Sequence, residues 1–193
     1  LEALQQKVAV WNEKLLQVRS QRIRPGLDDK ILTSWNGLML KGLVDAYRVF
    51  GQANYLELAM RNARFLKEKV IRANHQLYHS YKNGRATIDA YLEDYAAVIE
   101  AYIALYQATF EVEWLNLAKK LTDYAIRNFY DEQEGLFFFT DANAEKLIAR
   151  KKEIFDNVIP ASNSMMAKNL YWLHLYFEEA AYLVKARQML GQL

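Results

Sequence analysis

Acidic side chains stand at three points of this chain, each just ahead of a long apolar segment. Asp28 is followed by Asp29, Glu93 is followed by Asp94, and Asp156 stands alone before the last apolar segment. Adjacent carboxyls beside a buried helix can have separated pKa values, which suits one to donate a proton and the other to accept it. We take these five residues as candidates for acid and base catalysis. Helix starts also favour acidic side chains, so each has a structural alternative.

Aromatic, amide and basic side chains surround the same segments and are candidates for binding a substrate there. Aromatic rings offer stacking faces to a sugar, amides position it, and basic groups near helix starts favour an acidic sugar. These candidates are Trp35, Asn36, Tyr91, Tyr95, Phe139, Arg150, Lys152 and Asn163. Core packing is the alternative for the rings, and a solvated loop is the alternative for the basic residues. We assign Thr33, Ser34 and Ser162 to helix capping.

Several other chemistries find no support in the sequence. The chain has no cysteine, which excludes a thiolate nucleophile, a disulfide and a Cys-ligated metal in this segment. His75 and His79 have the spacing of a helical metal pair, but they lie in a predicted extended segment, where four residues span about 13 Å. No serine-nucleophile, P-loop or dinucleotide motif is present. We therefore predict no metal and no cofactor.

The charge balance and hydropathy limit the possible partners. Twenty-five Lys and Arg residues against 23 Asp and Glu leave a net charge of +2, which gives no reason to expect nucleic-acid binding. No apolar run approaches the roughly 20 residues that span a bilayer, and no signal peptide is recognisable, so we expect no membrane partner and a cytoplasmic location. Because the chain begins with Leu1 inside a helical pattern, we expect it to be a fragment.

An internal repeat organises the elements that must position the candidate residues. The segment Tyr55–Ala59 matches Trp114–Ala118, 59 positions further on, and a shift of 127 carries Tyr55 onto Tyr182. Each copy predicts a helix that is apolar nearly all round, followed by an amphipathic one. The predicted inner helices are 34–50, 93–108 and 162–178, and the outer helices are 53–71, 112–129 and 180–191.

Further segments complete the predicted elements. Residues 1–19 carry an apolar stripe of Leu4, Val8, Trp11, Leu15 and Val18, as in an outer helix whose inner partner lies upstream. Residues 76–80 and 135–140 are prone to β structure and are followed by turn residues at 83–84 and 141–143, so we expect small hairpins there.

These elements predict an all-α fold, a partial (α/α)6 toroid of about seven helices with short β-hairpins in its loops. Residues 1–193 form a single domain, about half of the ring. Its open ends should expose apolar surface and permit a homodimer. The 127-residue shift also places Asp29 on Asp156 and Asn36 on Asn163. We therefore expect the three inner-helix starts to share one mouth.

Four motifs carry a resemblance to a known family. The segments 24–37, 91–96, 135–140 and 159–164 resemble the YyaL-like, spermatogenesis-associated thioredoxin-domain proteins. The resemblance implies a thioredoxin-like domain upstream, absent from this chain, as a partner of the toroid within the same protein. It also implies similarity to six-hairpin glycosidases and to the N-acylglucosamine 2-epimerase group.

Two functions remain open from the sequence. The intact toroid is expected to bind, and to hydrolyse or epimerise, a sugar or glycan at its mouth, with the five carboxyls for acid and base work. The alternative is a non-catalytic helical scaffold for the thioredoxin-like domain or for a protein partner. Substitution of the mouth residues separates the two, because only the first function needs them.

Overall fold

Three helical hairpins form the body of the molecule, whose computed structural model describes residues 1–144 and 149–191. Within each hairpin a long inner helix is followed by an outer helix, as the repeat predicted. The helices are α2 (Thr33–Phe50) with α3 (Ala53–Phe65) and the π-helical η1 (Leu66–Val70), α4 (Leu92–Thr109) with α5 (Val112–Phe129), and α6 (Ser162–Phe177) with α7 (Ala180–Leu190). This architecture confirms the predicted partial (α/α)6 toroid.

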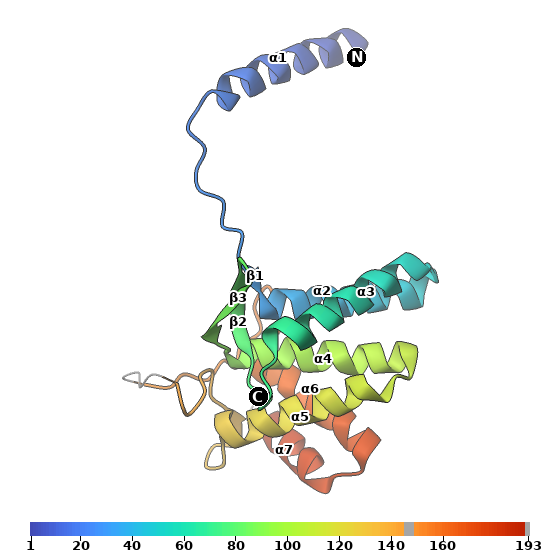
Figure 1. Ribbon diagram of the computed structural model, residues 1–193, viewed down its shortest axis with the longest axis vertical. Helices are drawn as coiled ribbons and strands as arrows, with labels where there is room; N and C mark the ends of the chain where they lie inside the picture. Colours follow the sequence, from blue (N-terminus) through green and yellow to red (C-terminus); the bar gives the residue numbers. More distant parts are fainter. Residues whose placement is uncertain (145–148, 192–193) are drawn as a thin grey trace.

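The inner helices α2, α4 and α6 lie side by side, with α4 in the middle (Figure 1). Most residues of α4 are buried, as its apolar sequence predicted. α2 approaches α4 closely at Gly37, where an added Cβ would stand 2.8 Å from the carbonyl carbon of Ala97 and 2.9 Å from the nitrogen of Val98. On the other side, the Asn169 amide of α6 donates to the Ala96 carbonyl at 2.9 Å.

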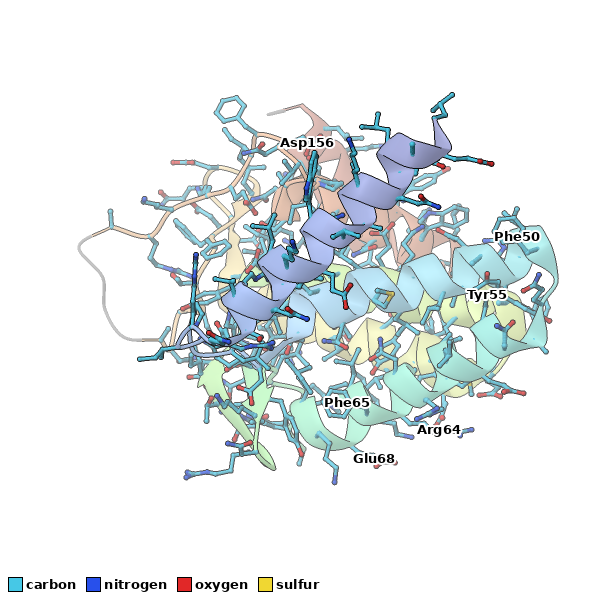
Figure 2. The ribbon with its side chains drawn as sticks, turned by 90° about the horizontal axis from the view of Figure 1, so that it is seen from above. Phe50, Tyr55, Arg64, Phe65, Glu68 and Asp156 are labelled. Atoms are coloured by element: carbon cyan, nitrogen blue, oxygen red, sulfur yellow. The ribbon has the colours of Figure 1, made fainter. Side chains whose placement is uncertain are left out.

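The outer helix α3 shows why the second helices are amphipathic. Ala59 and Ala63 of α3 are fully buried, as is Leu66 at the start of η1. Arg64 and Glu68 are exposed and turn away from α2 (Figure 2). The helix therefore follows the predicted pattern of one apolar and one charged face.

Each hairpin turns through one residue in the left-handed backbone conformation. This residue follows the inner helix directly and is Gly51 (φ 66°), Phe110 (φ 59°) or Glu178 (φ 55°). Its N–H donates to the carbonyl four residues earlier, which caps the inner helix.

A three-stranded antiparallel sheet stands at the end of the body where α2 and α4 begin (Figure 1). Its strands are β1 (Ile31–Leu32), β2 (Tyr78–Lys82) and β3 (Arg85–Asp89), in that order. β2 and β3 form the predicted hairpin, with the turn at residues 83–84. The sequence did not predict β1, whose two residues pair with β2 and join the start of α2 to the hairpin.

The second hairpin differs from the prediction. β5 (Leu136–Phe137) pairs with β4 (Tyr130–Asp131), which precedes it, rather than with a strand after residues 141–143. The turn residues that the sequence placed after the strand belong to another turn, in which Asp141 accepts the N–H of Asn143 at 2.7 Å. The turn in this hairpin instead includes Gly135, at φ 68°.

Helix α1 (Glu2–Ser20) forms as predicted but stands apart from the body, to which it is joined by a turn at residues 21–22 and an extended segment, residues 23–30 (Figure 1). None of its residues is buried, so the predicted packing as an outer helix is not seen here. Its apolar stripe is exposed throughout.

The two open edges of the three-hairpin body expose apolar side chains, as predicted. On one edge Trp35 and Met39 of α2 are 70% and 60% exposed. On the other, Tyr171 and Leu190 border a hollow of 440 Å³ between α6 and α7. Among the described residues, no helix is long and apolar enough to cross a membrane.

Candidate functional site

Asp94 is the centre of the cluster at the inner-helix starts. It is fully buried in the first turn of α4. Its Oδ1 accepts the N–H of Ser34 at 2.8 Å, and its Oδ2 accepts the N–H of Tyr91 at 3.0 Å. Oδ2 also lies 2.9 Å from Nδ1 of His79 on β2. One carboxylate therefore joins α2, α4 and the sheet, and its burial makes it a positioning group rather than one that touches a substrate.

His79 is held by this carboxylate with its ring only partly exposed. The hydrogen bond to Asp94 raises the pKa of His79 above its ordinary value of 6.5, against an opposing effect of burial. Because Nδ1 faces Asp94, Nε2 is the nitrogen left for another partner. The sequence did not predict this role of His79, because its spacing from His75 suggested only a metal-binding pair.

The raised pKa of His79 predicts a pH-dependent stability. The ion pair with Asp94 stabilises the fold fully below pH 6.5, the ordinary pKa, and this contribution is lost as the pH rises through the higher pKa of the folded state. We expect His79→Asn to lower Tm more at about pH 6 than at about pH 9. Thermal unfolding across this range measures the difference.

His75→Asn is the control for this prediction. Burial lowers the pKa of His75, so its contribution has the opposite sign, and its replacement should help the fold slightly at low pH. A Tm loss in His79→Asn that stays constant across the range would contradict the proposed ion pair.

Glu93 follows Tyr91 and Leu92 in the first turn of α4 and is half-buried. Burial is the main cause that raises the pKa of Glu93 above 4.5, and the nearby carboxylates of Asp94 and Glu153 raise it further. Glu153 accepts the N–H of Ser162 at 3.0 Å, so it fixes the start of α6. Glu93 therefore lies where α4 and α6 begin, with a proton affinity above that of an ordinary carboxylate.

Two aromatic rings lie beside these groups. Tyr91 stacks on Phe139, with ring centroids 5.0 Å apart and an interplanar angle of 11°. The ring of His79 meets Tyr91 edge-on at 4.9 Å. Both aromatic residues are partly exposed, so they provide an apolar face next to the titratable groups.

The cluster also bears on the predicted absence of a metal. Within the described residues, donor atoms of His79, Glu93 and Asp94 lie within 4.8 Å of one another. Asp94 already accepts two backbone N–H groups and contacts Nδ1 of His79. We assign the geometry to a hydrogen-bonded pair, and the absence of a metal stays a prediction.

The other three predicted acidic residues have contacts of their own. Asp28 is exposed and pairs with Lys30 at 3.4 Å, and Asp29 pairs with Lys82 of β2. Asp156, labelled in Figure 2, accepts the N–H of Ala161 at 2.7 Å and so caps α6. The structure thus brings together only Glu93 and Asp94 of the five.

Two residues that the sequence predicted to bind a substrate are instead buried in the structure. Tyr95 is fully buried, and its hydroxyl accepts the N–H of Leu77 at 2.9 Å. Asn163 is also fully buried, and its side chain accepts from and donates to the backbone of Phe137. Both side chains hold β segments onto inner helices and offer no surface to a substrate.

Two further predicted binding residues, Arg150 and Lys152, are engaged with the loop around β4 and β5. The guanidinium of Arg150 lies 4.0 Å from the centre of the Phe138 ring and donates to the Thr140 carbonyl. Lys152 pairs with Asp131 at 2.5 Å. The charges of Arg150 and Lys152 therefore stabilise this loop through contacts within the chain.

Trp35 and Asn36 lie away from the cluster. They line a separate hollow of 600 Å³ between α2 and α3, together with Arg61 and Phe65. Asn36 donates to the carbonyl of Leu32 at 2.8 Å, which fixes the start of α2. Neither residue contributes to the Glu93 cluster.

The prediction that Thr33, Ser34 and Ser162 cap the inner helices through their side chains was wrong. Thr33 donates to the Tyr78 carbonyl, and the N–H of Ser34 is satisfied by the distant Asp94. The hydroxyl of Ser162 is buried without a hydrogen-bond partner in the described part of the chain. Carboxylates from other segments satisfy these helix starts, which sequence spacing alone did not reveal.

Inner helices that begin around a polar cluster, inside a layer of outer helices, define this chain as part of a toroid of the six-hairpin glycosidase type. The family model of the beta-L-arabinofuranosidase GH127 catalytic domain matches residues 32–150, more than half of the chain. The chain therefore belongs to this family.

A curated relative confirms the resemblance that the sequence motifs carried. The chain is 35% identical over 172 residues to spermatogenesis-associated protein 20 from Homo sapiens, an alignment that covers 84% of this chain and 22% of that protein. The chain thus spans less than a quarter of the length of this relative.

Solved structures show the same fold at low identity. A glycoside hydrolase family 76 mannosidase from Bacteroides thetaiotaomicron VPI-5482 matches with a TM-score of 0.70 at 20% identity, over 87% of this chain and 45% of that one. Cellobiose 2-epimerase from Bacillus thermoamylovorans B4167 matches with a TM-score of 0.69 at 18% identity, over 84% of this chain and 44% of that one. In both cases the match covers just under half of the other chain.

Proposed function

We propose that the toroid containing this chain binds and processes a carbohydrate at the mouth where α4 begins. The observation that carries the proposal is the half-buried Glu93, which stands beside the His79–Asp94 pair and the stacked rings of Tyr91 and Phe139. Glu93 is the proton-transfer carboxyl, and Asp94 positions its neighbours.

The physical chemistry of the cluster supports this proposal. The ring pair offers an apolar face of the kind that stacks on the C–H face of a sugar, while the titratable groups next to it serve the hydroxyls. The raised pKa of Glu93 means that this carboxyl keeps its proton to a higher pH than an ordinary glutamate, which favours a role in acid and base catalysis. The similar structures are themselves named for a mannosidase and a cellobiose epimerase.

Glu93→Gln in the full-length protein tests the proposal. A panel of mono- and oligosaccharides is screened for binding and turnover with the wild-type protein. For a sugar that is turned over, we expect the variant to lose at least about 100-fold in kcat and to keep binding, because the amide retains the shape but transfers no proton. Tm should not fall, since a desolvated charge is removed.

Glu57→Gln is the matched control, because Glu57 is an exposed residue of α3. It should leave both turnover and Tm unchanged. Absence of carbohydrate binding by the wild-type protein, or full turnover by Glu93→Gln, would refute the proposal.

A scaffold function is the second candidate, and the apolar open edge between α6 and α7 favours it. Tyr171 and Leu190 would contact a thioredoxin-like domain, a protein partner or a second copy of the chain. In that case Tyr171→Lys should abolish the association, while Glu93→Gln should leave it intact.

A further inference from the structure

We propose that helix α1 docks on the α2–α3 edge of the body within its own chain. The inference goes beyond the proposed function, because it concerns the surface that α1 covers rather than the mouth. In the structure no residue of α1 is buried. The part of α1 that makes the contact is its exposed apolar stripe, which consists of Leu4, Val8, Trp11, Leu15 and Val18.

The hollow of 600 Å³ between α2 and α3 supplies the first argument. Its lining includes the apolar side chains of Trp35, Leu58 and Phe65. Trp35 and Leu58 are 70% and 45% exposed, and Met39, one turn after Trp35, is 60% exposed. The edge and the stripe of α1 are therefore two apolar surfaces of one chain, and both gain free energy when each covers the other.

The contacts between the hairpins supply the second argument, because each outer helix packs on the hairpin that follows it. From α3, the carbonyl of Ala63 accepts the Tyr102 hydroxyl of α4 at 3.2 Å. From α5, Lys119 pairs at 3.0 Å with Glu179, directly before α7. Helix α1 precedes the α2–α3 hairpin, as α3 precedes the second hairpin and α5 the third. The same packing places α1 on the α2–α3 edge.

A cation–aromatic contact recurs at these two junctions. The ammonium of Lys67 lies 5.8 Å from the centre of the Trp114 ring, and that of Lys119 lies 5.5 Å from the Tyr182 ring. The repeat places Tyr55 of α3, labelled in Figure 2, at the position of these two rings. Within residues 1–144 and 149–191, no cation lies over Tyr55. A basic residue of docked α1 supplies this cation, and the candidates are Lys7, Lys14 and Arg19.

The segment between α1 and β1 permits the docking. Residues 23–30 are extended, and a segment of this length spans at most about 26–29 Å, which is about the length of α1 itself. Asp29 pairs with Lys82 of β2, so the end of the segment next to β1 is held at the sheet. α1 stands on the side of the body where α2 lies (Figure 1), and seen from above its end overlies the start of α2 (Figure 2). A bend in the segment therefore brings α1 onto the edge without a change in the body.

The docking decides which surfaces remain open to other molecules. Trp35 is covered by α1, so it is not available to stack on a substrate. The α2–α3 edge is closed by the chain itself, and a partner of the scaffold kind would have to use the edge between α6 and α7.

Photocrosslinking in the full-length protein tests the docking. Benzoylphenylalanine replaces Trp11 in the middle of the stripe, the protein is irradiated, and mass spectrometry locates the adducts. We expect adducts within residues 31–65, which comprise β1, α2 and α3. Glu13 lies about 200° around the helix from Trp11, so the same probe in place of Glu13 is the matched control and should give no adduct there.

Hydrogen exchange of the full-length protein gives a readout without a probe. We expect the amides of α1 to be protected in the wild type, because a docked helix opens less often than a free one. Trp11→Glu puts a charge into the stripe, so it should speed exchange in α1 at least about 10-fold and leave exchange in α4 unchanged. Glu13→Gln should keep the wild-type rates.

Three results would overturn the inference. The first is a set of adducts from position 11 that lies wholly outside residues 31–65, and the second is wild-type exchange in α1 as fast as in an isolated peptide. The third comes from irradiating a mixture of ¹⁴N-labelled and ¹⁵N-labelled copies. Adducts that join a light chain to a heavy chain would show that α1 docks on a second copy instead of its own chain.

Discussion

Gly37→Ala is expected to cost about 3–4 kcal/mol of folding free energy, because the new methyl group has no room between α2 and α4. Its Cβ would stand 2.8 Å from the carbonyl carbon of Ala97 and 2.9 Å from the nitrogen of Val98. These are backbone atoms of the most buried helix, so no side chain can rotate to relieve the overlap. The two inner helices would have to separate.

Gly42→Ala is the matched control, since Gly42 lies on the same helix with nothing within 4 Å of its would-be Cβ. This change should stabilise the protein by about 0.5–1 kcal/mol, because alanine has a higher helix propensity than glycine. Urea unfolding measures both variants. Equal midpoints for the two would show that the close approach of α2 and α4 is wrong.

Asp94→Ala is expected to cost about 3–5 kcal/mol, the range for breaking a buried, charged hydrogen-bond network. The change leaves the N–H groups of Ser34 and Tyr91 without an acceptor and His79 without its partner. Chemical denaturation provides the measurement. Because this carboxylate connects α2, α4 and the sheet, the variant should also hold the starts of these helices less firmly against the sheet.

Asp45→Ala provides the comparison for a surface carboxylate. Asp45 pairs with Lys41 one turn away, with about half of its side chain exposed, and such pairs contribute about 0.3–0.5 kcal/mol. If Asp94→Ala costs no more than Asp45→Ala, Asp94 does not join the three segments.

The helices could be predicted from the sequence because apolar periodicity reports burial directly. In α3, Ala59 and Ala63 face the core and Arg64 faces water, as their spacing indicated. Strand pairing was less predictable. β4 and β5 have two residues each, and nothing local states whether Leu136 pairs with a strand before or after it.

The candidate site was predicted only in part, for a related reason. The adjacent carboxyls of Glu93 and Asp94 were recognisable, but which of them faces the core depends on the rotation of α4. The position of His79 beside Asp94 could not be predicted without the fold of the β2–β3 hairpin, because His79 lies 15 residues earlier in the chain. Residue type also could not separate the buried Tyr95 from the exposed face of Tyr91.

The left-handed residues between the paired helices show what the repeated unit has preserved. Phe110 lies 59 positions after Gly51, and Glu178 lies 127 after it, the same offsets that relate the helices. Only the first is a glycine, so each of the others holds about 1–2 kcal/mol of conformational strain. The left-handed conformation recurs at this position in all three hairpins, although the amino acid differs each time. The repeat in this chain is therefore clearer in its backbone torsion angles than in its amino-acid sequence.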